Sequence, residues 1–166
     1  FQKALVSLET GFSGLDKIFD LNKKQIEKKL KENIPNKLLL IAEAFRKRIN
    51  LKRIYNLSKI DPWFLEQIKE IVDNEIKIKN KGLPKDFNEF NRIKSIGFSD
   101  KKLAELTNVS EDIVRGKRTA LKILPIFKKV DTCAAEFRSF TPYMYSTYQR
   151  SFSINSECEA DPSAKK

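Results

Sequence analysis

The strongest constraint on the fold is the segment DPWFLEQIKEIVDNEIKIKNKG, which runs from Asp61 to Gly82. Asp61 can cap a helix N-terminus, Pro62 suits the first helical position, and Gly82 can end the helix. One face repeats at three- and four-residue steps, through Phe64, Leu65, Ile68, Ile71, Val72, Glu75 and Ile76. The segment therefore predicts a long amphipathic helix that buries one side in a core.

Shorter amphipathic segments lie on both sides of this helix. The spacing of their apolar residues predicts helices over residues 2–9, 23–32, 37–49, 51–58 and 86–95, with a loop over 11–22. The chain has 166 residues, of which 40% are hydrophobic. That length and composition are sufficient for one domain with a substantial core.

A weak internal repeat organises the helical part. The segment Ile49–Leu65 aligns without gaps on Phe98–Val114, and apolar positions and capping residues correspond throughout. Each copy consists of a short helix, a tight turn that ends in a capping residue, and the start of a second helix. The repeat predicts two similar helical hairpins that bury their apolar faces against one another.

The character of the sequence changes after Pro125. The stretches FKKVDTCAAEF and TPYMYSTY contain β-prone runs, Val130 with Thr132 and then several tyrosines, which favour a short hairpin or two extended strands. From Ser151 the polar composition predicts a linker. The expected fold class is therefore mostly α, with two similar helical hairpins and a short extended or β-hairpin C-terminal segment.

The absence of histidine excludes several kinds of catalytic site. The chain has no histidine at all, so it can form neither a Cys–His dyad nor a Ser–His–Asp triad. Two cysteines cannot fill a four-coordinate zinc site by themselves. The sequence also contains no Walker A or G-x-G-x-x-G pattern. We expect a domain without a catalytic site, a cofactor site or a metal site of its own.

The cysteines and the ends of the chain indicate a compartment and a context. Cys133 and Cys158 are expected to be free thiols in a reducing environment, since no export signal is visible. The sequence contains no apolar run near the ~20 residues that span a bilayer. We therefore expect a cytoplasmic protein. Because the chain begins with Phe1, we also expect it to be part of a longer one.

The net charge of +11 leaves a nucleic-acid-binding alternative open. The segment Leu103–Arg118 resembles a DNA-binding helix-turn-helix, which would place its second helix in the major groove. Two observations weigh against a free-standing basic module of this kind. Lysines make up 25 of the 33 basic residues, which indicates a general usage bias. In the first repeat the equivalent second helix opens with the apolar residues Trp63 and Phe64, which cannot read base edges.

Two further patterns could indicate a site. The carboxylates Asp131 and Glu136, or Glu157 and Glu159, could form an acid–base pair, but no partner groups accompany them, so docking or solvation explains them better. Trp63 and the twelve phenylalanines could line a ligand pocket. At helical spacing we interpret these aromatic residues as core.

Several motifs, taken together, resemble one family. KKVDTCAAEF, TPYMYSTY and ECEADPS look like a segment of the carbamoyl-phosphate synthase large subunit. The stretches IAEAFRKR, IDPWFL and GFSDKKLAEL also resemble that family and occur in its order, and QKALVSLETGFSG is similar to the closing helix of the preceding ATP-grasp half. The resemblance covers essentially the whole chain, apart from a generic stretch over 23–36 and an apparent insertion over 150–155.

The resemblance implies a place within a larger enzyme. The family's large subunit has two ATP-grasp halves that use ATP with magnesium or manganese, and a helical oligomerisation domain lies between them. Residues 1–14 would close the first half, residues 15–150 would form the oligomerisation domain with its extended segment, and residues 151–166 would lead toward the second half. The implied partners are those halves, other large subunits in a homo-oligomer, and a glutaminase small subunit. The implied product is carbamoyl phosphate, made from bicarbonate, ATP and glutamine-derived ammonia for arginine and pyrimidine synthesis.

No catalytic, cofactor or metal residue can be carried over from this family, but two sets of contact residues are expected. Ile26 and Leu30, on the basic helix over 23–32, are the candidate oligomer contacts. The expected anchors of the C-terminal segment are Asp131, Thr132, Glu136 and Tyr145. In the same segment, Cys133 and Phe137 are expected to pack as apolar residues.

The interpretation of Cys133 gives a first prediction. Cys133→Ser should change stability slightly and leave ATP turnover by the parent enzyme intact, because no histidine, nearby second thiol or cationic cluster accompanies this thiol in the sequence. Loss of ATP turnover in a well-folded variant would show that the thiol takes part in the chemistry.

Overall fold

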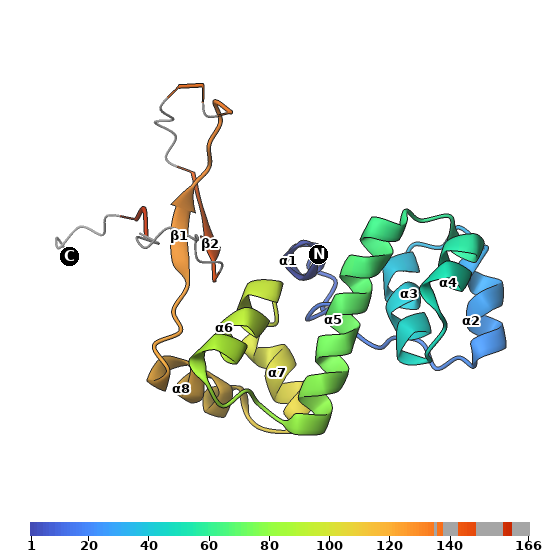
Figure 1. Ribbon diagram of the computed structural model, residues 1–166, viewed down its shortest axis with the longest axis horizontal. Helices are drawn as coiled ribbons and strands as arrows, with labels where there is room; N and C mark the ends of the chain where they lie inside the picture. The colour runs from blue at the N-terminus through green and yellow to red at the C-terminus, as the bar shows by residue number, and fades with distance from the viewer. Residues whose placement is uncertain (135, 138–142, 149–157, 161–166) are drawn as a thin grey trace.

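The computed structural model describes residues 1–134, 136–137, 143–148 and 158–160, which form eight helices and one two-stranded sheet. The long helix α5 runs through the middle of the helical body, with α2–α4 on one side and α6–α8 on the other (Figure 1). The sheet projects from the α8 side. The helices are α1 (Gln2–Ser7), α2 (Lys23–Leu30), α3 (Lys37–Arg46), α4 (Leu51–Ser58), α5 (Pro62–Lys81), α6 (Phe87–Ile96), α7 (Asp100–Thr107) and α8 (Glu111–Ala120), and the strands are β1 (Ile126–Lys129) and β2 (Met144–Thr147). The mostly α class with a short C-terminal hairpin is confirmed.

Helix α5 forms as predicted from its capping residues. The Asp61 carboxylate accepts a hydrogen bond from the Trp63 N–H at 2.8 Å, and Gly82 ends the helix with a φ of 80°. Leu65, Ile68 and Val72 are fully buried. The predicted burial of Trp63 and Phe64 is wrong, because these side chains are 58% and 46% exposed. They lie in the first turn of α5, where they contact each other instead of entering the core.

The two predicted helical hairpins are present. In each hairpin the first helix ends on a residue in the left-handed conformation, Lys59 at the end of α4 and Asn108 at the end of α7. The capping side chains correspond as expected: Asn50 and Ser99 begin the first helices, and Asp61 and Ser110 begin the second ones. The matching core side chains are also buried, Ile54 with Leu103 and Leu65 with Val114.

In the structure, each copy of the repeat also includes the preceding helix, α3 in the first copy and α6 in the second. Arg48 after α3 and Gly97 after α6 both have positive φ, 58° and 104°. In the next residue the Ile49 N–H donates to the Ala44 carbonyl at 3.0 Å, and the Phe98 N–H donates to the Ile93 carbonyl at 3.4 Å. The body therefore consists of two three-helix units, α3–α5 and α6–α8, with the same turn geometry.

Helix α2 packs inside the body rather than on its surface. Asn22 and Gln25 form a reciprocal capping box at its N-terminus. The side chains of Ile26 and Leu30 have 0% exposure and belong to the core that α2 shares with α3 and α4. The expected exposure of these two residues is thus wrong, since α2 covers the apolar face of α3. Neither side chain presents a surface to another chain in this structure.

The C-terminal hairpin is antiparallel and begins earlier than expected. Ile126 pairs with Thr147, and Lys128 pairs with Tyr145. The Val130 N–H donates to the Tyr143 carbonyl at 2.9 Å, which continues the pairing beyond β1. Asp131 and Thr132 follow the strand instead of lying in it. Most of the predicted linker over 151–166 lies outside the described residues.

The burial of Leu30 gives a second prediction. Leu30→Ala should lower the free energy of unfolding by about 2–5 kcal/mol, because it leaves a cavity between α2 and α3. Denaturant unfolding measures the change, and Leu8→Ala, at a side chain that is 66% exposed, is the matched control. Equal effects of the two substitutions would contradict the placement of Leu30 in the core.

Candidate functional site

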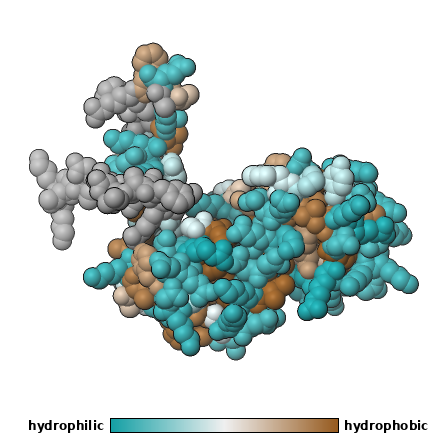
Figure 2. All heavy atoms as spheres, viewed as in Figure 1, coloured by the Kyte–Doolittle hydropathy of each residue, from teal (hydrophilic) through white to brown (hydrophobic). Residues whose placement is uncertain are grey.

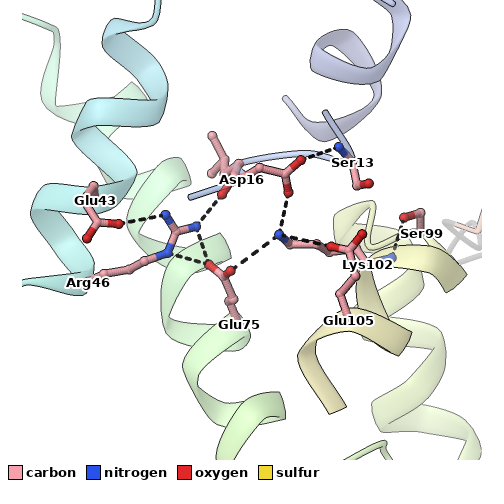
Figure 3. A network of polar contacts seen from close by, with 9 residues as sticks. Ser13, Asp16, Glu43, Arg46, Glu75, Ser99, Lys102 and Glu105 are labelled. Carbon is pink, nitrogen blue, oxygen red and sulfur yellow. Dashed lines mark hydrogen bonds and ion pairs between the residues drawn. The ribbon is translucent and has the colours of Figure 1, made fainter. Parts of the chain in front are cut away.

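The most organised polar feature of the described residues is a network of charges where three helices meet the loop before α2 (Figure 3). We call Asp16, Arg46, Glu75 and Lys102 the ionic junction. Arg46 comes from α3, Glu75 from α5 and Lys102 from α7, and Asp16 lies in the loop. Their side chains are between 9% and 20% exposed, so the junction is largely screened from water.

Short contacts join every member of the ionic junction. The Arg46 guanidinium donates to one Glu75 oxygen from Nε at 3.0 Å and from Nη2 at 2.7 Å. The Lys102 ammonium lies 2.5 Å from Asp16 Oδ1 and 3.8 Å from the other Glu75 oxygen. Arg46 also donates to the Leu15 carbonyl and lies 3.4 Å from the Glu43 carboxylate. The junction therefore ties the loop to both three-helix units.

The surroundings of Asp16 favour its charged form. Burial alone would raise the pKa of this carboxyl, but the hydrogen bond from Lys102 and the Ser13 N–H, with the positive charges of Lys102 and Arg46, outweighs it. The pKa of Asp16 is consequently lowered. The Ser13 contact, at 2.6 Å, also fixes the shape of the loop.

A second cluster connects the helical body with the end of the hairpin. Asp100 accepts hydrogen bonds from Lys94 at 2.8 Å and from Arg118 at 3.0 Å. The ring of Tyr148, which follows β2, lies 5.0 Å from the Lys94 ammonium and 5.9 Å from the Arg118 guanidinium. Burial lowers the pKa of Lys94 and raises that of Tyr148, while the two cations lower the pKa of Asp100 despite its burial.

These clusters are built to hold structure together. Each charged group of the ionic junction faces an opposite charge, which leaves no unpaired acid, base or nucleophile there. Within the described ranges, no group of three His, Cys, Asp or Glu side chains could hold a metal ion. No described helix is long and apolar enough to cross a membrane.

Both arginines of α8 are paired with neighbouring carboxylates. Arg115 contacts Glu111 at 2.9 Å and Asp112 at 3.3 Å, and Arg118 is held by Asp100. These ion pairs neutralise the arginines that a recognition helix would present to DNA. The helix-turn-helix interpretation therefore gains no support from the geometry.

The residues predicted to anchor the C-terminal segment form a local turn. The Asp131 carboxylate accepts the Cys133 N–H at 2.9 Å, and the Glu136 N–H donates to the Cys133 carbonyl at 3.0 Å. The Thr132 hydroxyl lies 3.8 Å from the Cys133 sulfur. Tyr145 is apart from them in β2 and is 51% exposed. Their role in docking stays a prediction.

Two details of that segment differ from expectation. Cys133 is half-buried rather than buried, and Phe137 is 74% exposed, so the predicted packing of Phe137 is wrong. Both residues lie beyond the helical body, where the described residues form no core around them. Cys133 and Cys158 are free thiols in the structure. Glu157, the partner considered for Glu159, lies outside the described residues.

Three aromatic side chains pack on one another at the surface of the helical body. Trp63 and Phe64 pack edge to face at 5.0 Å between ring centroids, and Phe1 packs edge to face on Phe64 at 6.0 Å. We call these three residues the aromatic patch. Hydrophilic side chains cover most of the face of the body seen in Figure 2, with apolar areas between them.

The sequence contains one signal for the ionic junction. Glu75 interrupts the apolar stripe of α5. A carboxylate at a core position needs a buried cation, and this requirement predicts partners such as Arg46 and Lys102. Nothing local indicated Asp16, whose partner Lys102 lies 86 residues away.

The lowered pKa of Asp16 gives a third prediction. A carboxyl with a lowered folded-state pKa contributes stability above its unfolded-state value of about 3.9, and this contribution is lost as the pH falls through the folded-state pKa. Asp16→Asn should therefore reduce the loss of unfolding free energy between about pH 5 and pH 2. Denaturant unfolding at several pH values measures this, with Asp112→Asn, at an 88% exposed side chain, as control. An unchanged acid dependence would contradict the geometry of the junction.

Comparison with known proteins identifies the family of this chain. A family model described as the carbamoyl-phosphate synthetase large chain, oligomerisation domain, matches residues 1–122, which include all eight described helices. The large chain from Neisseria meningitidis serogroup B is 45% identical over the whole of this chain, and those from Brucella melitensis biotype 1 and Haemophilus ducreyi are each 42% identical over 99% of it. The chain spans about 15% of the length of these relatives, which are named carbamoyl phosphate synthase large chain. The chain therefore belongs to the family of carbamoyl-phosphate synthetase large-chain oligomerisation domains.

Proposed function

We propose that this domain assembles and connects large chains of a glutamine-hydrolysing carbamoyl-phosphate synthase without taking part in catalysis. The observation that carries the proposal is the family match over residues 1–122, which coincides with the helical body. The paired charges of the ionic junction fit a structural role, because a catalytic group needs at least one functional atom that is open to a substrate.

The proposal extends to the parent enzyme and its partners. The parent uses ATP with magnesium or manganese in two halves that flank this domain, and it makes carbamoyl phosphate from bicarbonate, ATP and ammonia released from glutamine. Its proposed partners are other large chains and a glutaminase small subunit, and its compartment is the cytoplasm. Family membership and the names of the relatives support the identity of the parent enzyme. The metal, the small subunit and the compartment rest on the family resemblance alone.

The aromatic patch replaces Ile26 and Leu30 as the proposed contact between large chains. Its three rings belong to the matched part of the chain, and Trp63 is 58% exposed. Tryptophan and phenylalanine are enriched at the centres of protein interfaces, where burying an exposed ring gives a large gain from apolar contact. The ionic junction links α5, which carries Trp63 and Phe64, to α3 and α7.

This proposal gives a fourth prediction, made for the intact large chain. Trp63→Lys together with Phe64→Lys should shift the sedimentation profile toward a smaller assembly, because a cation at each position would have to be desolvated in the contact. ATP turnover should persist. Ile113→Lys is the matched control, since Ile113 is equally exposed, at 57%, but lies on α8 away from the patch.

The possible outcomes test the aromatic patch and the oligomerisation role separately. An unchanged profile of the double variant would remove the aromatic patch from the contact between chains. A wild-type large chain that sediments as a monomer at every concentration would overturn the oligomerisation role.

A further inference from the structure

Within the part of the chain that the structure describes, no strand pairs with the outer edge of β2. The bond from the Val130 N–H to the Tyr143 carbonyl fixes which residues face inward, because the backbone groups of alternate residues point to opposite edges of a strand. Tyr145 therefore faces β1, whereas the N–H and C=O groups of Met144 and Ser146 face outward. Among the described residues, the Ser146 carbonyl accepts from Lys3 of α1, and no other contact to these outward groups is found.

The opposite edge of the hairpin is covered by the chain itself. On β1, the Phe127 carbonyl accepts the Glu159 N–H at 2.8 Å, and the Lys129 N–H donates to the Glu159 carboxylate at 2.5 Å. The Phe127 N–H lies 3.4 Å from the Cys158 sulfur. Cys158 and Glu159 thus contact the β1 edge, and the β2 edge has no equivalent segment beside it among the described residues.

The sequence of β2 lacks the features that normally prevent a strand edge from pairing with another strand. Natural proteins protect open edges with lysine, proline or a bulge, but β2 reads MYST and carries no charge. On one face of the hairpin, Phe127 and Met144 are 42% and 41% exposed, and on the other face Tyr145 is 51% exposed. A two-stranded hairpin is only marginally stable in water. An uncharged, β-prone edge with exposed apolar neighbours fits an added strand.

The comparisons indicate where such a strand comes from. The oligomerisation-domain model ends at residue 122, before the hairpin, whereas the relatives align over 99–100% of the chain. The hairpin is thus part of the large chain but lies outside the unit matched as oligomerising. About 85% of the length of those relatives lies outside this chain. Most of the polypeptide available to cover the hairpin therefore lies in the rest of the large chain.

We infer that an extended segment from elsewhere in the same large chain adds a strand to the outer edge of β2. It accepts hydrogen bonds from the N–H groups of Met144 and Ser146 and donates to the Met144 carbonyl. Apolar side chains of that segment cover Phe127 and Met144 on one face. Lys3, at the Ser146 carbonyl, marks the end of the added ladder. The inference rests on the proposed function, since it requires a longer large chain.

Amide hydrogen exchange in the intact large chain tests the inference. The Met144 and Ser146 amides should exchange slowly, and should do so equally at concentrations where sedimentation shows assembled and dissociated chains. Protection that disappears on dissociation would assign the edge to a second copy and overturn the inference. Rapid exchange at every concentration would show that the edge is open and would also overturn it.

A matched pair of variants sharpens this fifth prediction. Ser146→Pro removes an outward N–H without removing a β1–β2 hydrogen bond, so it should weaken the added strand and speed exchange of the Met144 amide by about tenfold. Ser146→Ala keeps the N–H and should leave that exchange unchanged. Equal exchange in the two variants would contradict the added strand.

The readouts also separate this inference from the proposed function. The Tyr145 amide, which faces β1, reports whether the hairpin itself survives the proline substitution. The sedimentation profile should be the same in both variants, because the strand is added within one chain. Failure of the exchange prediction with normal assembly would overturn the inference alone.

Discussion

The buried charge of Glu75 is the constraint on which the helical body depends. A carboxylate in the apolar stripe of α5 is costly unless cations reach it, and the two that do, Arg46 and Lys102, come from different three-helix units. Lys102 in turn needs Asp16 from the loop. No part of this arrangement is favourable until the other parts are in place. The junction therefore makes the folding of the two units and the loop cooperative, and it makes a partly formed body unfavourable.

Local sequence signals predicted the helices and turns well. The caps at Asn50, Asp61, Ser99 and Ser110 act within a few residues of chain, so their pattern alone identifies the helix starts. The two matching hairpins were likewise predicted from local sequence patterns. The sequence predicted α3 and α6 but not that they belong to the repeat, because the shared feature is a backbone turn at Arg48 and Gly97, two residue types with nothing in common.

Most of the incorrect predictions concern burial, which depends on the tertiary arrangement. Ile26 and Leu30 lie on a short basic helix, α2, whose own sequence does not indicate that its apolar face packs on α3. Trp63 continues the apolar pattern of α5 by one turn, beyond the point where neighbouring helices supply a core. The family could be named from its C-terminal motifs, whereas the residues that hold the domain together could not be identified from them.

The length of α5 has a mechanical consequence. Its 20 residues form a continuous rod of about 30 Å that contacts α3 and α4 of its own unit and α7 of the other. Near its far end, Lys77 is paired with Glu89 of α6 at 2.5 Å. A tilt of α5 imposed at Trp63 would therefore also displace the α6–α8 unit, which contacts the other end of the helix. Such a movement needs no helix to unfold.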